Sequence, residues 1–172
     1  PISFAANGGS GTMANQTIGY EQSTALTANA FKRTGYTFSS WNTAANGSGT
    51  AYADKAPVLN LGDTTLYAQW TANKYTVRFH DNTGTGDTIV NQTMTYGKSA
   101  ALKANAFTNS PYSFLSWNTN ADGSGTSYAD KATVKNLTST NKGVVHLYAQ
   151  WDAPVTAITL DKGTGTADGT AA

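Results

Sequence analysis

Two histidines, His80 and His146, are the residues of this chain best suited to acid–base chemistry, because imidazole titrates near neutral pH. A catalytic histidine needs a nucleophile or a carboxylate within hydrogen-bonding distance. His80 precedes Asp81, but neighbouring residues of a strand point to opposite faces of a sheet, so these two side chains are not expected to meet. We expect His80 to be an exposed residue at a strand end, and the sequence predicts no catalytic residue and no enzymatic activity.

The segment 118–123 reads Asn-Thr-Asn-Ala-Asp-Gly and resembles the first half of a calcium-binding loop, with oxygen ligands at alternate positions and glycine sixth. The twelfth position, where a bidentate carboxylate is required, is Ala129. The matching segment 42–47 contains no carboxylate. An asparagine–glycine turn is therefore the favoured interpretation, and no metal ion or other cofactor is predicted.

The overall composition argues against several classes of partner. Only 12% of the 172 residues are charged, the net charge is +1 and there is no basic run, so neither nucleic-acid binding nor an anionic-membrane patch is expected. No apolar stretch has the length of a membrane span, and the absence of cysteine excludes disulfides and thiolate metal sites. Because the chain begins with Pro1, we expect it to be a processed or excised piece.

An internal repeat organises the chain. Ala-Asn-Ala-Phe at 28–31 returns at 104–107, Ser-Trp-Asn-Thr at 40–43 returns at 116–119, and Leu-Tyr-Ala-Gln-Trp at 66–70 returns at 147–151. The shift grows from 75 residues at Phe4 and Phe79 to 76 and then 81, so the second copy gains one residue before Asn91 and five between Leu137 and Leu147. Both insertions lie in Gly-, Thr- and Asn-rich stretches typical of surface loops.

Eighteen of the nineteen aromatic residues occupy matching positions in the two copies, and only Tyr75 is unmatched, because its counterpart would precede Pro1. The first copy is therefore expected to lack the beginning of its first strand. Repetition at strand spacing favours a structural core over an exposed binding surface. The residues assigned to the core are Phe4, Tyr36, Phe38, Trp41, Trp70, Phe79, Tyr112, Phe114, Trp117 and Trp151.

The patterning predicts a mainly β fold. Apolar and polar residues alternate over 75–79 as in a half-buried strand, and 93–96 is expected to return beside it, so each copy should open with a hairpin. The segments 66–70 and 144–151 are the expected closing strands. Residues 99–107 show some helical spacing and could form about two turns, so we expect at most one short helix in each copy.

These elements predict a module over 1–71, a second over 74–152 and an extra strand with a tail over 153–172. The linkers are short, so the modules should form a semi-rigid rod. The residues that could pair with another chain by strand exchange are Val155, Ala157, Ile158 and Leu160. Two charged pairs recur in both copies, Asp54-Lys55 and Asp130-Lys131, and each is expected to be a loop ion pair or a turn cap.

Three features together resemble the Listeria–Bacteroides repeat, the family that includes the B repeat of internalin-type surface proteins. They are Phe79 with its Asn/Gly-rich turn, the segment 35–42, and the closing Leu-Tyr-Ala-Gln-Trp. The resemblance covers roughly residues 1–151. It implies tandem β-grasp-like modules in multi-domain bacterial surface proteins. The tail over 155–162 is similar to the opening strand of bacterial immunoglobulin-like domains, and it could equally begin a third, divergent copy of the repeat, because 160–165 resembles 79–86.

Three functions follow as hypotheses. The first is a stalk or adhesive segment of an extracellular or cell-surface bacterial protein, with a surface protein or glycan as partner. The second is a filament subunit, in which the spare strand of one copy pairs with the open first-strand edge of the next. The third is a carbohydrate-binding module that stacks tryptophan or tyrosine rings on sugars.

Overall fold

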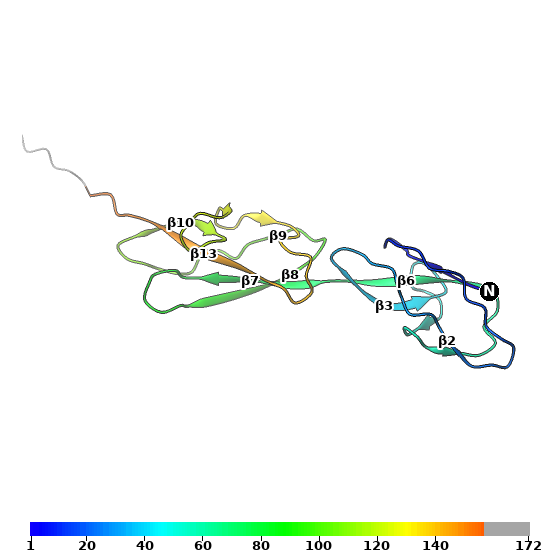
Figure 1. Ribbon diagram of the computed structural model, residues 1–172. Helices are drawn as coiled ribbons and strands as arrows, with labels where there is room; N and C mark the ends of the chain where they lie inside the picture. The colour runs from blue at the N-terminus through cyan, green and yellow to red at the C-terminus, as the bar shows by residue number, and fades with distance from the viewer. Residues whose placement is uncertain (157–172) are drawn as a thin grey trace, which may run out of the picture.

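The computed structural model describes residues 1–156, which form two β-sheet modules arranged end to end in an elongated molecule (Figure 1). None of these residues lies in a helix, so the mainly β class expected from the sequence is confirmed. The buried apolar residues form two separate clusters, one within residues 2–70 and one within residues 75–151. Each module therefore has its own core.

Module 1 contains the strands β1 (Ile2–Ala5), β2 (Thr24–Ala25), β3 (Tyr36–Asn42), β4 (Ala51–Tyr52), β5 (Pro57–Val58) and β6 (Thr64–Ala72). Module 2 contains β7 (Lys74–His80), β8 (Ile89–Thr95), β9 (Ala100–Ala101), β10 (Ser113–Asn118), β11 (Ser127–Tyr128), β12 (Thr133–Val134) and β13 (Val144–Asp152). The main sheets have the orders β1-β6-β3-β4 and β11-β10-β13-β7-β8. In both, the first strand runs parallel to the last, which pairs antiparallel with β3 or β10.

The hairpin predicted at the start of each copy is complete only in module 2, where β7 and β8 pair antiparallel along their whole length. In module 1 the equivalent pairing is reduced to one bridge between Ile2 and Gln16, whose backbone groups exchange hydrogen bonds of 2.7 and 2.8 Å. The main sheet of module 1 is therefore one strand narrower, and Gln16 already occupies part of its β1 edge.

A β-bulge lies at the same place in both modules and lets two aromatic residues of one strand face the core. Side chains alternate along a strand, so Phe38 and Trp41, three positions apart, would lie on opposite faces of a regular sheet. The pairing of β3 with β6 shifts register between Phe38 and Ser40, and the extra residue brings both rings together at a centroid distance of 5.0 Å. β10 has the same shift between Phe114 and Ser116.

One tryptophan forms the centre of each core. Trp41 is fully buried, and the ring centroids of Phe4, Phe38 and Phe31 lie 4.9, 5.0 and 6.1 Å from its own. Tilted and edge-on contacts of this kind are favourable for aromatic rings. Trp117 has the same environment, formed at 4.7, 4.9 and 6.0 Å by Phe79, Phe114 and Phe107.

The positions that the repeat assigns to the core are unequally covered. Trp41, Phe79 and Trp117 are at most 1% exposed. The half-buried positions are Phe4, Tyr36, Phe38, Trp70, Phe114 and Trp151. Tyr112 is 48% exposed and does not belong to a core. Its counterpart Tyr36 is covered by a ring of the other module, whereas Tyr112 lies at the far end of module 2, where no second module of the described chain is present.

The segment 99–107, which shows some helical spacing, forms no helix. Ala100–Ala101 is strand β9 and pairs antiparallel with β12. Further along, the Asn105 N–H donates to Oδ1 of Asp130 at 2.8 Å. Partners from elsewhere in the module thus hold the backbone extended and outweigh a weak helical propensity. Since the described residues contain no helix, the β-grasp detail of the resemblance is not confirmed.

Amide side chains at matching positions satisfy the backbone of the irregular segments. Asn42, which is 3% exposed, accepts from the N–H groups of Ala44 and Gly49 and donates to the carbonyls of Gly47 and Gly49. Asn118 repeats these four bonds in module 2. Buried backbone groups need such partners wherever no ladder supplies them. The low charge and high amide content of the chain therefore serve the fold.

The tail is described only as far as residue 156. Val155, the first of the residues predicted to take part in strand exchange, is 98% exposed. The other three, Ala157, Ile158 and Leu160, lie outside the described residues, and strand exchange through them stays a prediction.

Because the aromatic residues of module 2 differ in burial, their removal should affect stability to different extents. Trp117→Ala should lower the free energy of unfolding by roughly 3–5 kcal/mol, because it empties the centre of the core. Tyr112→Ala should change it by about 0.5 kcal/mol or less, because Tyr112 is a surface residue that is 48% exposed. Urea unfolding followed by circular dichroism measures both, and equal losses would contradict the assignment.

Candidate functional site

A single residue, Asn73, separates the last strand of module 1 from the first strand of module 2. Its N–H donates to the carbonyl of Gly35 at 2.8 Å, and its Oδ1 accepts from the Thr37 hydroxyl at 2.6 Å. Its carbonyl accepts from the Tyr96 N–H at 2.8 Å, and its Nδ2 donates to the carbonyl of Ser139 at 2.8 Å. Asn73 is 8% exposed and makes two bonds to each module, so it fixes their relative orientation.

Two tyrosines close the joint beside Asn73. Tyr36 of module 1 and Tyr96 of module 2 meet edge to face, with centroids 5.8 Å apart and planes at 77°. The Tyr96 ring also lies on Gly35, where an added Cβ would stand 2.1 Å from it. Gly35 has a φ of +77°, so glycine is required there both by the backbone and by the close approach of the ring. The Arg33 guanidinium covers Tyr36, 3.9 Å from its centroid.

The longer loop of module 2 also binds Lys74, the first residue of β7, directly after Asn73. The Lys142 N–H donates to the carbonyl of Lys74 at 2.7 Å, and Oδ1 of Asn141 accepts from the Lys74 N–H at 3.3 Å. Asn141 and Lys142 lie in the stretch between Leu137 and Leu147 where the second copy is five residues longer than the first. The insertion therefore contributes to the joint.

An open groove of about 540 Å³ runs along the joint and is lined by Arg33, Tyr36, Trp70, Asn73 and Asn141 among others. A smaller groove of about 330 Å³ occupies the equivalent place at the far end of module 2, lined by Tyr112, Phe114 and Trp151 among others. The two grooves share their repeat positions. They differ because a second module forms one wall of the first groove.

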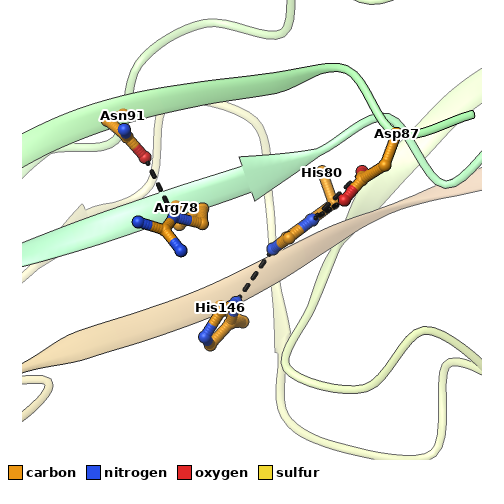
Figure 2. Close-up of polar contacts among 5 residues, drawn as sticks. All are labelled: Arg78, His80, Asp87, Asn91 and His146. Carbon is orange, nitrogen blue, oxygen red and sulfur yellow. Dashed lines mark hydrogen bonds and ion pairs between the residues drawn. The ribbon is translucent and has the colours of Figure 1, made fainter.

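The two histidines, far apart in the sequence, meet on the main sheet of module 2 (Figure 2). β7 and β13 run side by side, and His80 Nε2 lies 2.9 Å from Nδ1 of His146. On its other side, His80 Nδ1 lies 2.8 Å from Oδ2 of Asp87. Both ring nitrogens of His80 are thus engaged, which leaves neither free to act on a bound molecule.

The expectation that His80 is exposed was wrong. It is 7% exposed, because Asp87 from the β7–β8 loop folds over it and the Tyr148 ring stacks on it, with centroids 4.5 Å apart and planes at 16°. His146 lies at the surface. Partial burial, followed by the charges of His80 and Arg78, lowers the pKa of His146, although Asp87 acts in the opposite direction.

The other candidate side chains bind backbone groups. Asp54 Oδ1 accepts from the Asn29 N–H at 2.9 Å, as Asp130 does from Asn105, so each carboxylate binds a segment 25 residues earlier in the chain and does not cap its own turn. In the calcium-like segment, Asp122 Oδ1 accepts from the Ser124 hydroxyl and N–H at 2.6 and 3.0 Å, and these bonds lower the pKa of its carboxyl. Within residues 1–156, no three His, Cys, Asp or Glu side chains come together as metal ligands.

The fold and the joint show two β modules, both copies of one repeat, that are held end to end by a fixed joint. The sequence profile of the Listeria-Bacteroides repeat domain matches residues 1–69 and 75–150, and the chain belongs to this family. It is also 38% identical over 140 residues to a Gly-rich membrane protein of Evansella cellulosilytica. That match spans 77% of this chain and 16% of the relative, so the chain corresponds to about a sixth of that protein. The described residues include no helix able to cross a bilayer.

The histidine pair predicts a pH dependence of stability. Below pH 6.5, the ordinary pKa of the group, His146 in the unfolded chain takes up a proton that the folded chain resists. The free energy of unfolding should therefore fall as the pH drops from about 6.5 towards the lowered pKa. His146→Thr, which installs the residue found at the matching position 65, should reduce this dependence in thermal melts between pH 5 and 7.5. Thr65→Ser in module 1 is the control and should leave it unchanged; an unchanged profile for His146→Thr would contradict the assignment.

Proposed function

We propose that this chain is a structural segment of a bacterial surface or secreted protein, a stiff stalk that spaces or presents other parts of that protein, and that it is not an enzyme. The observation that carries the proposal is the joint. A one-residue linker hydrogen-bonded to both modules, beside an interlocked tyrosine pair, is the arrangement expected where the distance and direction between the ends must be kept.

Three further observations support this function. The parts that match between modules are the aromatic cores and the amide caps, which maintain the fold. The histidines, in contrast, belong to module 2 alone, so the repeated unit itself carries no acid–base group of this kind. Finally, the family is one of tandem repeats, and the relative is called a membrane protein, which fits a place at the cell surface.

The carbohydrate-binding alternative has less support. The groove at the joint is lined by Tyr36 and Trp70, residue types that stack on sugars. However, Arg33 covers the face of Tyr36, and Tyr96 packs against the same ring. The Trp70 Nε1–H is committed to the carbonyl of Ala6 at 2.9 Å. The Tyr36 ring is engaged in holding the modules together and Trp70 is bonded within module 1, so the stalk is the better-supported function.

The joint is tested by comparing two tyrosines in equivalent turns. Tyr96→Ala should weaken the coupling between modules, because it removes the edge-to-face pair. The pair contributes about 0.5–1.5 kcal/mol in addition to the free energy gained by burying the ring surface. Gly35→Ala should act in the same direction, because the new Cβ displaces the Tyr96 ring. Nitrogen-15 relaxation and small-angle X-ray scattering should then report modules that reorient more independently, each still folded.

Tyr20→Ala is the matched control, because Tyr20 occupies the same repeat position in module 1 and is 83% exposed. It should leave the relaxation rates and the scattering profile unchanged. A Tyr96→Ala chain that behaves like the Tyr20→Ala chain would rule out the joint as the source of stiffness.

A further inference from the structure

Tyr20 is unusually exposed for an aromatic residue at a matched position. It is 83% exposed, whereas its counterpart Tyr96 is half-buried in the joint between the modules. An isolated exposed tyrosine has little meaning by itself. Tyr20 is informative because Tyr96, at the same repeat position in module 2, is covered by a neighbouring module, and the contacts between the two are known.

The turn that carries the ring is the same in both modules. The Glu21 N–H donates to Oδ1 of Asn60 at 2.6 Å, and the Gly97 N–H donates to Oδ1 of Asn136 at 2.6 Å. The backbone is left-handed at both positions, with φ of +54° at Glu21 and +81° at Gly97. Tyr20 is thus presented from the same local structure as Tyr96, although no module covers it.

We propose that the surface around Tyr20 is a docking face for another module of this repeat, joined ahead of module 1 and presenting a Gly-Tyr pair like Gly35-Tyr36. Tyr20 would lie on that glycine and against that tyrosine, as Tyr96 does. This inference rests on the proposed stalk function and adds to it the direction in which the stiff array extends.

The chemistry of the face specifies the partner. A glycine is needed where the ring lands, since at Gly35 even a Cβ would stand 2.1 Å from the Tyr96 ring. A cation beside the tyrosine, as Arg33 is beside Tyr36, would lie near Glu21, which occupies the place of Gly97. At Gly97 an added Cβ would be 3.0 Å from the Tyr36 hydroxyl, so the larger Glu21 requires the partner's tyrosine hydroxyl to lie a few tenths of an ångström further away than that of Tyr36.

The far end of module 2 does not meet these requirements. Pro111 replaces Gly35 at the position where the ring would land, and Pro154 replaces Asn73 in the linker. Proline has no N–H, so it cannot form the bond that Asn73 makes to the Gly35 carbonyl. A second copy of the chain therefore does not fit end to end in this manner, and the exposed Tyr112 is no equivalent acceptor.

Covalent connection is part of the proposal, because the linker itself makes the joint. Asn73 donates to Gly35 and accepts from Tyr96 through its own backbone. A separate molecule would bring the ring contact without these bonds. The occupant is thus a module in the same chain.

The test is a three-module chain in which residues 1–75 are added ahead of Pro1 of the 172-residue chain. This addition places a tyrosine directly before Pro1, where the repeat lacks one. We expect hydrogen exchange at the Tyr20 amide to slow by about tenfold relative to the 172-residue chain, because it gains the bond that Tyr96 makes to Asn73. Relaxation rates should show the added module turning with its neighbour.

Two variants of the longer chain serve as controls. One is Gly35→Ala in the added module alone, and the other is Tyr20→Ala. In each, relaxation rates should show the added module reorienting independently of module 1. If Tyr20 exchange is unchanged while the Asn73 joint stays rigid, the inference is overturned and the stalk function stands. If the added joint and the Asn73 joint are both mobile, the inference and the proposed stalk function are both overturned. Association of the 172-residue chain that Tyr20→Ala abolishes would overturn the requirement for a covalently linked partner.

Discussion

In each module, one face of the main sheet carries a central tryptophan and must be covered. No helix is available among the described residues to cover it, and the rest of the structure depends on how this is done. Trp41 and Trp117 are each packed among three phenylalanine rings. A sheet of this kind is stable only if its apolar face is removed from water, and within the described residues only short strands and irregular segments are available to do so. Irregular backbone cannot satisfy its own polar groups as a helix does, so the module needs side chains that supply those bonds. The aromatic core and the amide-rich composition therefore have the same cause, which is the need to cover the sheet with irregular backbone.

That constraint explains which polar residues recur. Gln16 and Gln92 each bridge two backbone groups of the segment beside them, Gln16 through Ala25 and Thr27 at 2.8 Å, and Gln92 in the same way in module 2. Neutral amides donate and accept at once and need no counter-ion. Charged side chains would carry a larger desolvation cost in the same half-buried places. A low charge content follows from the architecture and gives no indication of a ligand.

The repeat, the longer strands of the main sheets and the buried tryptophans were accessible from the sequence, because aromatic residues at fixed spacing reflect local geometry. Phe38 and Trp41 also carried a sign of the bulge, since two core residues three apart do not fit a regular strand. The meeting of His80 with His146 was not accessible. It depends on the register of the parallel pair β7 and β13, which the five-residue insertion obscures, and on a loop that places Asp87 over the ring. The helical spacing over 99–107 misled for a related reason, because the partners that hold it extended lie about thirty residues away.

The two copies differ most where their surroundings differ. Positions that face a module's own core have the same neighbours in both copies, so the same residue types satisfy both. Positions at the ends of a module face whatever comes next, and there Gly35 is matched by Pro111, Asn73 by Pro154 and Gly97 by Glu21. An end residue that is constrained in one copy can vary in the other without cost to the fold, because only the joint imposes the constraint. Differences at the ends of the modules therefore mark interfaces, and the retention of tyrosine at position 20, with most of its ring in solvent, is the exception that requires an explanation beyond the fold of its own module.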